Sequence, residues 1–165
     1  MDNLNEFKIM LTGAVTALFG LLGWQGALLL GWIGLMVADY ASGTLAAKRL
    51  GNWSSKVARD GVMHKGGMML VVLAAALADL VLGVAWEQLG MPWEWPWLLL
   101  TLVLIWYCLT EVGSILENAG KMGAPVPDWF AAALDAGLHI VDGKGEEIAD
   151  KINKDKREQE GVDHE

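Results

Sequence analysis

The sequence is poor in the residues on which enzymes and metal proteins depend. Its 165 residues include one cysteine, Cys108, which excludes an internal disulfide and a cysteine-based metal cluster. The histidines, His64, His139 and His164, are too far apart in sequence for metal-ligand spacing. There is no phosphate-binding glycine loop and no nucleophile elbow. We therefore predict no enzyme activity, no metal site and no cofactor.

Positive charge is also scarce, and long stretches carry no charge at all. The chain has 12 basic and 20 acidic residues without a basic face, which argues against a nucleic-acid partner. Residues 9–38 contain no formal charge, although a soluble helix must show a polar face to water. One helix of that length would measure about 45 Å, against a bilayer core of about 30 Å. A polar, glycine-bracketed turn at 23–26 (GWQG) instead predicts two short spans, 7–22 and 27–47.

Two further apolar blocks, 66–86 and 97–116, complete the pattern. The predicted fold is an all-α integral membrane protein with about four short transmembrane helices. Three spans are possible if 7–47 forms one bent span, or if its first segment lies on the membrane surface.

Charge in the loops sets the expected orientation. The loop predicted over 48–65 carries five basic residues, whereas the segment 87–96 carries none. By the positive-inside rule the first loop is cytoplasmic, so we expect both termini of this multi-pass protein on the cytoplasmic side of the membrane. The orientation-setting residues are Lys48, Arg49, Lys56, Arg59 and Lys65. The tryptophans expected at the outer interface are Trp24, Trp86, Trp93, Trp95 and Trp97.

The chain changes character after the last apolar block. We expect a transmembrane domain over 1–120, a Gly/Pro breaker and an amphipathic helix over 121–141, and a charged cytoplasmic tail over 142–165 that is either a solvated helix or flexible. The amphipathic helix is acidic, so anionic lipid should repel it. Packing against its own bundle is the favoured interpretation.

Two acids are expected at similar depth on the cytoplasmic side. Asp39 lies nine residues before Lys48, about 13 Å into the membrane. Glu111 lies ten residues before Lys121, and Ser114 and Asn118 continue its helix face. On the second span the polar face also includes Ser42 and Gly43. Two such faces either line an aqueous path or join subunits. The alternative is that the acids extend to the membrane surface or form local hydrogen bonds near a helix end.

A third acid, Asp79, is expected deeper, about 21 Å from Lys65 along the helix. It is either a protonated acid hydrogen-bonded inside the bundle or a lumen-lining, gating group.

Three segments in order carry a resemblance. They are 39–43 (DYASG), then Ser54 and Ser55 followed by Gly61 and Lys65, then 111–118 (EVGSILEN) with 123–127 (GAPVP). The chain resembles the phage lysis and toxin-secretion holin family over most of its length up to about residue 130. The tail departs from that pattern, because it is acidic where many holins end in a basic cluster.

The resemblance implies a small protein of the bacterial (host) cytoplasmic membrane that assembles with its own copies into lesions. Those lesions release an endolysin, a cell-wall-degrading enzyme, or in some relatives a toxin, without necessary direct contact. The expected partners are thus the lipid bilayer and further copies of the chain. The candidate pore or oligomer residues are Asp39, Tyr40, Ser42, Gly43, Asp79, Glu111, Ser114, Glu117 and Asn118, and the family-motif turn comprises Gly123, Pro125 and Pro127.

Two other functions compete with this one. A small-solute or ion carrier would use the same carboxylates, but the sequence shows no inverted repeat and no pair of proline-broken spans. A membrane anchor or scaffold would recruit a partner through the acidic tail.

Overall fold

A computed structural model describes residues 2–162, and within that range the chain folds into helices alone. This confirms the all-α prediction. Three of the helices, α2, α3 and α4, are long and apolar enough to cross a membrane. The helices are α1 (Asp2–Leu22), α2 (Trp24–Arg49), α3 (Ser55–Gln88), α4 (Leu98–Lys121) and α5 (Asp128–Val162).

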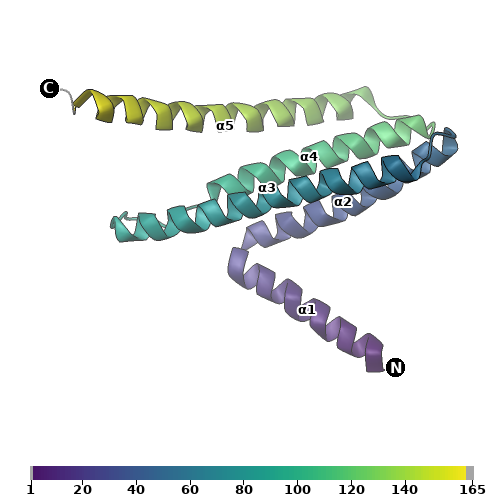
Figure 1. The fold of residues 1–165 in the computed structure, drawn as a ribbon, viewed down its shortest axis with the longest axis horizontal. Coiled ribbons are helices and arrows are strands. Elements are labelled where there is room, and N and C mark those ends of the chain that lie inside the picture. The colour runs from purple at the N-terminus through teal and green to yellow at the C-terminus, as the bar shows by residue number, and fades with distance from the viewer. Residues whose placement is uncertain (1, 163–165) are drawn as a thin grey trace.

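The helices α2, α3 and α4 form a bundle in which α4 touches both of the others (Figure 1). Its core is small, and the outward faces of the three helices stay exposed and apolar. This is the distribution expected of spans whose outer surface meets lipid rather than water. The buried apolar side chains are Trp32, Met36, Met68, Val72, Leu100 and Leu104.

The helix α1 diverges from this bundle. Gly23 separates it from α2 with a positive φ of 56°, a conformation that favours glycine, and accepts a hydrogen bond from the Gly26 amide at 3.1 Å. The predicted turn at 23–26 is therefore present, and α1 and α2 form an open V (Figure 1). Ile9 and Met10 on α1 are largely exposed. The fourth span stays a prediction.

The bounds predicted for the basic loop, 48–65, are wrong. Lys48 and Arg49 end α2, and α3 already begins at Ser55, so only 50–54 connect the two helices. Ser54 caps α3, because its hydroxyl accepts a hydrogen bond from the Val57 amide at 3.2 Å. The polar sequence after it is the first part of the same long helix that later becomes apolar.

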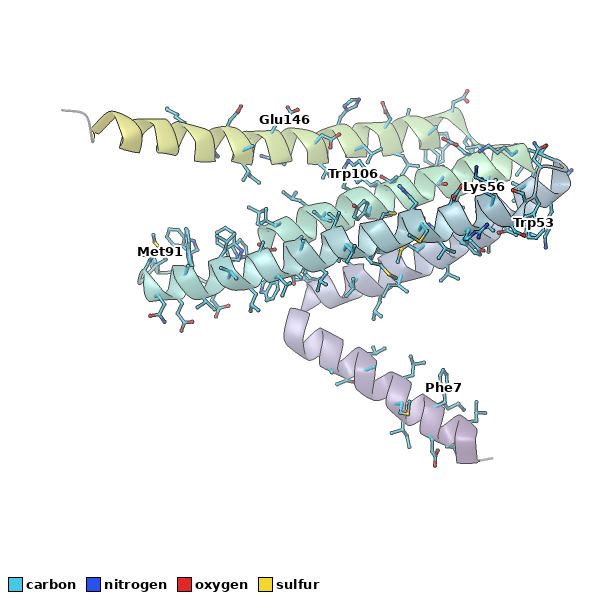
Figure 2. The ribbon with its side chains drawn as sticks, viewed as in Figure 1. Phe7, Trp53, Lys56, Met91, Trp106 and Glu146 are labelled. Atoms are coloured by element: carbon cyan, nitrogen blue, oxygen red, sulfur yellow. The ribbon has the colours of Figure 1, made fainter. Side chains whose placement is uncertain are left out.

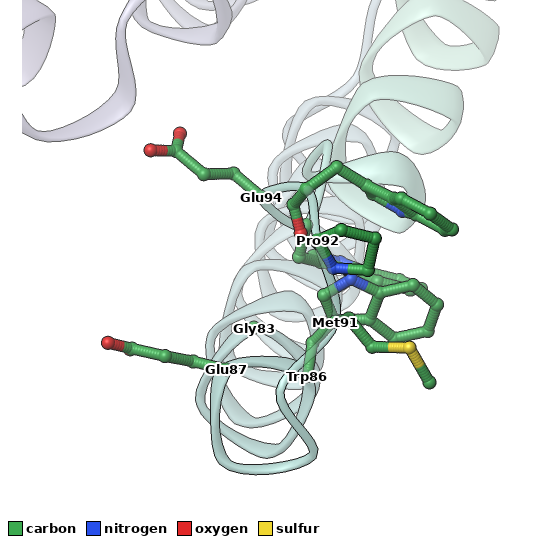
Figure 3. Close-up of a pocket in the computed structure, with 8 residues that line it drawn as sticks. Gly83, Trp86, Glu87, Met91, Pro92 and Glu94 are labelled. Carbon is green, nitrogen blue, oxygen red and sulfur yellow. Dashed lines mark hydrogen bonds between the residues drawn. The ribbon is translucent and has the colours of Figure 1, made fainter.

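Three of the five predicted interface tryptophans cluster where α3 passes into α4. The rings of Trp86 and Trp95 meet edge to face at 5.3 Å, and the Trp86 indole donates a hydrogen bond to the Trp93 carbonyl at 2.9 Å. A cavity of about 480 Å³ borders this cluster (Figure 3). The carboxyl groups of Glu87 and Glu94 point away from the rings, so the tryptophans pack against one another at this corner of the bundle.

The helix α5 returns along the bundle beside α4 (Figure 1). The helix α4 ends at Lys121 and α5 starts at Asp128, so the segment with the glycine and prolines connects the two helices. The half-buried side of α5 includes the apolar residues Phe130, Leu134, Leu138 and Val141. The helix continues through the charged segment to Val162, which matches the helical alternative for that segment.

Candidate functional site

Charged side chains from all three bundle helices meet at one place. The Lys65 ammonium of α3 lies 2.9 Å from Asp39 Oδ2 of α2. It also donates to both carboxylate oxygens of Glu111 on α4, at 2.7 and 2.6 Å. Glu111 is almost fully buried, and the other two side chains are largely so. Asp39, Lys65 and Glu111 form what we call the ion triad.

An amide on α4 completes the contacts of Asp39. Asn118 Nδ2 donates to Asp39 Oδ1 at 3.1 Å and to Ser42 Oγ at 3.2 Å, while the Ser42 hydroxyl donates to the Asp39 carbonyl. Gly43 allows this close approach, because a Cβ atom there would lie 3.4 Å from the Asn118 amide nitrogen. The depth argument from the sequence therefore paired the right faces of α2 and α4.

The triad does not have the composition of a metal site. Its cation is the lysine ammonium, which is held between the carboxyl groups of Asp39 and Glu111. In the low dielectric between helices, removing one partner would leave a buried charge uncompensated. The arrangement suits a clamp that holds three helices in fixed register.

A cleft leads from the loop end of the bundle to the triad. It has a volume of about 290 Å³ and is bordered by Trp53 near the α2–α3 connection and by Asp39, Lys65 and Asn118 at its inner side. Along α3, Met68 and Val72 follow Lys65 and belong to the buried apolar core. The polar cleft therefore ends on a dry layer within one subunit.

Asp79 occupies a different position from the triad. It is 1% exposed, and its carboxylate accepts hydrogen bonds from the Leu100 amide at 2.7 Å, the Leu99 amide at 3.2 Å and the Trp95 indole at 2.7 Å. Leu99 and Leu100 lie in the first turn of α4, where a capping side chain normally binds. Trp97, the residue before α4, provides no such cap and has a positive φ of 52°. Asp79 thus caps α4 from α3 with three N–H donors at its carboxyl group.

The remaining predicted residues lie around these two centres. Tyr40 and Ser114 line the cleft beside the triad. Glu117 is exposed and lies 3.5 Å from Lys121, one turn along α4. In the predicted turn, Gly123 has a positive φ of 87°. Pro125 and Pro127 follow it, exposed, before α5 begins.

Sequence reasoning missed the role of Lys65. It was assigned to the basic loop, and its position as the last charge before the run 66–78 was the signal that could have identified it. A lysine ten residues inside a long helix extends its charge toward acids on neighbouring spans.

Comparison with known proteins decides the family. The sequence profile described as the bacteriophage holin family matches residues 14–137. The chain belongs to the bacteriophage holin family. The match includes the ion triad, the Asp79 cap and the first part of α5, and it confirms the resemblance found in the sequence.

Relatives of this family member occur in several bacteria. An uncharacterized protein of Listeria monocytogenes is 33% identical over 156 residues, 94% of this chain and 99% of its own length. An uncharacterized protein of Halalkalibacterium halodurans is 34% identical over 125 residues, 76% of this chain and 86% of its own length. An uncharacterized 14.9 kDa protein of Clostridium perfringens is 28% identical over 96 residues, 58% of this chain and 65% of its own length. No solved structure matches the chain.

Proposed function

We propose that the protein is a non-enzymatic, holin-type pore former of the bacterial cytoplasmic membrane. Copies assemble in the plane of the membrane and open lesions through which an endolysin or a toxin leaves the cell. We place both termini in the cytoplasm before the lesion opens, with α1 as a fourth, short span.

The observation that carries the proposal is the dry middle of the subunit. Trp32, Leu100 and Leu104 are no more than 2% exposed, and they belong to the core layer between the ion triad and the Asp79 cap. A single subunit therefore offers no water path, and a hole has to form between copies. Membership of the holin family supports assembly of this kind.

The separate subunit is well suited to stay harmless in lipid. The acids of its spans have hydrogen-bond partners inside the subunit, and the outward faces of its spans are apolar. Such a subunit can accumulate without exposing charge to hydrocarbon. Lateral packing of these apolar faces then brings copies together.

The test is to express the full chain in bacteria and follow the membrane potential together with escape of a folded cytosolic reporter enzyme. Abrupt, simultaneous loss of both is the expected result. Loss of potential without reporter escape would overturn the proposal in favour of a carrier, and neither change would favour an anchor. Asp60→Asn, which alters one exposed charge near the start of α3, is the matched control and should leak on the parental schedule.

A further inference from the structure

The helix α5 lies at the level of the membrane-spanning part of α4. A Cβ atom on Gly137 would lie 3.2 Å from Leu109 Cδ1, which places the two helices in direct contact near the middle of α4. Farther along, Trp106 of α4 and Glu146 of α5, both labelled in Figure 2, border a cavity of about 500 Å³ together with Asp142. Val141, on the half-buried side of α5, borders the same cavity.

The other side of α5 is acidic. Helical periodicity places Asp128, Asp135 and Asp150 opposite Gly137 or near that opposite side, and all three are exposed. Glu147 is also exposed, and it is paired with Lys144 at 2.9 Å and Lys151 at 2.7 Å along one edge of the helix. The acids of the outer face are Asp128, Asp135 and Asp150.

This acidic face is incompatible with lipid where α5 stands. A span of 24 residues is about 36 Å long, and α5 with 35 residues is about 52 Å long, so the docked α5 covers the depth of the bilayer and more. Charged side chains in the bilayer core turn toward protein or water. The docked position therefore requires water on the outer face of α5.

The spans themselves offer little polar surface for such water. The Asp39, Glu111 and Asp79 carboxylates are engaged inside the subunit. The outward faces of α2 and α3 carry exposed apolar side chains such as Val37 and Leu77. At this depth, the polar surface that a subunit presents outward comes from α5.

We propose that α5, docked on α4, forms the water-facing wall of the lesion, and that α5 is undocked from α4 while lipid surrounds the spans. The inference rests on the pore-forming function proposed above. The segment 122–127, with its glycine and two prolines between α4 and α5, is the hinge. When the lesion opens, the acidic face turns to the water inside it.

The test measures docking by disulfide formation within one chain. In a Cys108→Ala background, the full chain carries Leu109→Cys and Gly137→Cys and is exposed to a membrane-permeant oxidant before and after the onset of leakage. Trypsin cleavage after Lys121 and Lys144 separates the two cysteines into peptides 66–121 and 122–144, so mass spectrometry detects the link. The control pair is Leu109→Cys with His139→Cys, because His139 lies on the outer face.

We expect the linked fraction of the test pair to rise at least about tenfold at the onset of leakage, as a shift from mostly undocked to mostly docked requires. The control pair should stay at background throughout. Two results would overturn the role of α5 and leave the pore function unaffected. One is leakage with an unchanged linked fraction of the test pair. The other is a linked fraction of the control pair as large as that of the test pair. Absence of leakage in the Cys108→Ala parent, and in the chain without substitutions, would instead overturn the pore function.

Discussion

Asp79 provides the sharpest test of the internal architecture. The substitution Asp79→Ala removes the acceptor of three hydrogen bonds, two from the first turn of α4 and one from the Trp95 indole. Each buried donor left without a partner costs about 1–3 kcal/mol. Because the donors lie at one end of the bundle and can recover some water contacts, we expect a total loss of about 3 kcal/mol of unfolding free energy.

Asp79→Asn should fall between the parent and the alanine variant. Its amide keeps one acceptor oxygen but replaces the other with an NH2 donor, so it cannot accept all three hydrogen bonds. We expect a loss of about 1–2 kcal/mol. Glu94→Gln is the matched control, because Glu94 is exposed in the connection between α3 and α4 and points away from the cluster.

Amide hydrogen exchange in detergent micelles measures this cap directly. A local loss of about 3 kcal/mol should speed exchange of the Leu99 and Leu100 amides about a hundredfold in Asp79→Ala, with little change in Glu94→Gln. Equal exchange in both variants would refute the cap. The lumen-lining prediction from the sequence needs its own readout: Asp79→Asn, at matched expression, should change the time of leakage, and unchanged timing would remove Asp79 from the lytic mechanism.

Three further perturbations test the ion triad and α5. Lys65→Met should cost about 3–5 kcal/mol of unfolding free energy in a detergent titration, because it leaves buried acids without their cation. Adding Glu111→Gln should restore part of the loss. A double variant as unstable as Lys65→Met alone would refute the pairing. Gly43→Val should cost about 1–3 kcal/mol by pushing on the Asn118 amide, so a parental stability would contradict that contact. Hydrogen bonds from two neighbouring lysines lower the pKa of Glu147 from 4.5 to about 2, so its support of the helix is present above pH 4.5 and lost as the pH falls toward 2; an NMR titration of its carboxyl with a midpoint near 4.5 would contradict the pairing.

The sequence predicted the features that depend on local composition. The end of α4 and the start of α5 follow from the glycine and prolines of 122–127, and the shared depth of Asp39 and Glu111 follows from counting residues inward from basic ends. The contact of Lys65 with the two acids was not predicted, because a basic residue near a membrane boundary was interpreted as a loop residue. In the structure α3 already begins at Ser55. Helices commonly extend past the bilayer, so charge marks the interface better than it marks the end of a helix.

The partners of Asp79 could not be predicted for another reason. They lie 16 to 21 residues away across an irregular connection, and their position depends on the left-handed conformation of Trp97. Sequence spacing cannot report which backbone amides such a connection turns toward an acid. The choice between a neutral buried acid and a gating group was therefore open, whereas the structure gives this carboxylate the role of a helix cap.

Two groups of charged residues have different roles in the chain: one stabilises the subunit, and the other favours opening of the lesion. The ion triad and the Asp79 cap lie on opposite sides of the dry layer, and both satisfy their acids with donors from the same subunit. Groups with complete internal partners gain little from new water, so they stabilise the subunit equally well before and after a lesion opens. A surface that drives opening must instead prefer water over lipid by a large margin. The acidic face of α5 meets that condition, since each charge kept out of the bilayer core is worth roughly 2.5–3.5 kcal/mol. Neutralising several of these acids together should therefore weaken the coupling between docking and leakage while leaving the core of the bundle unchanged.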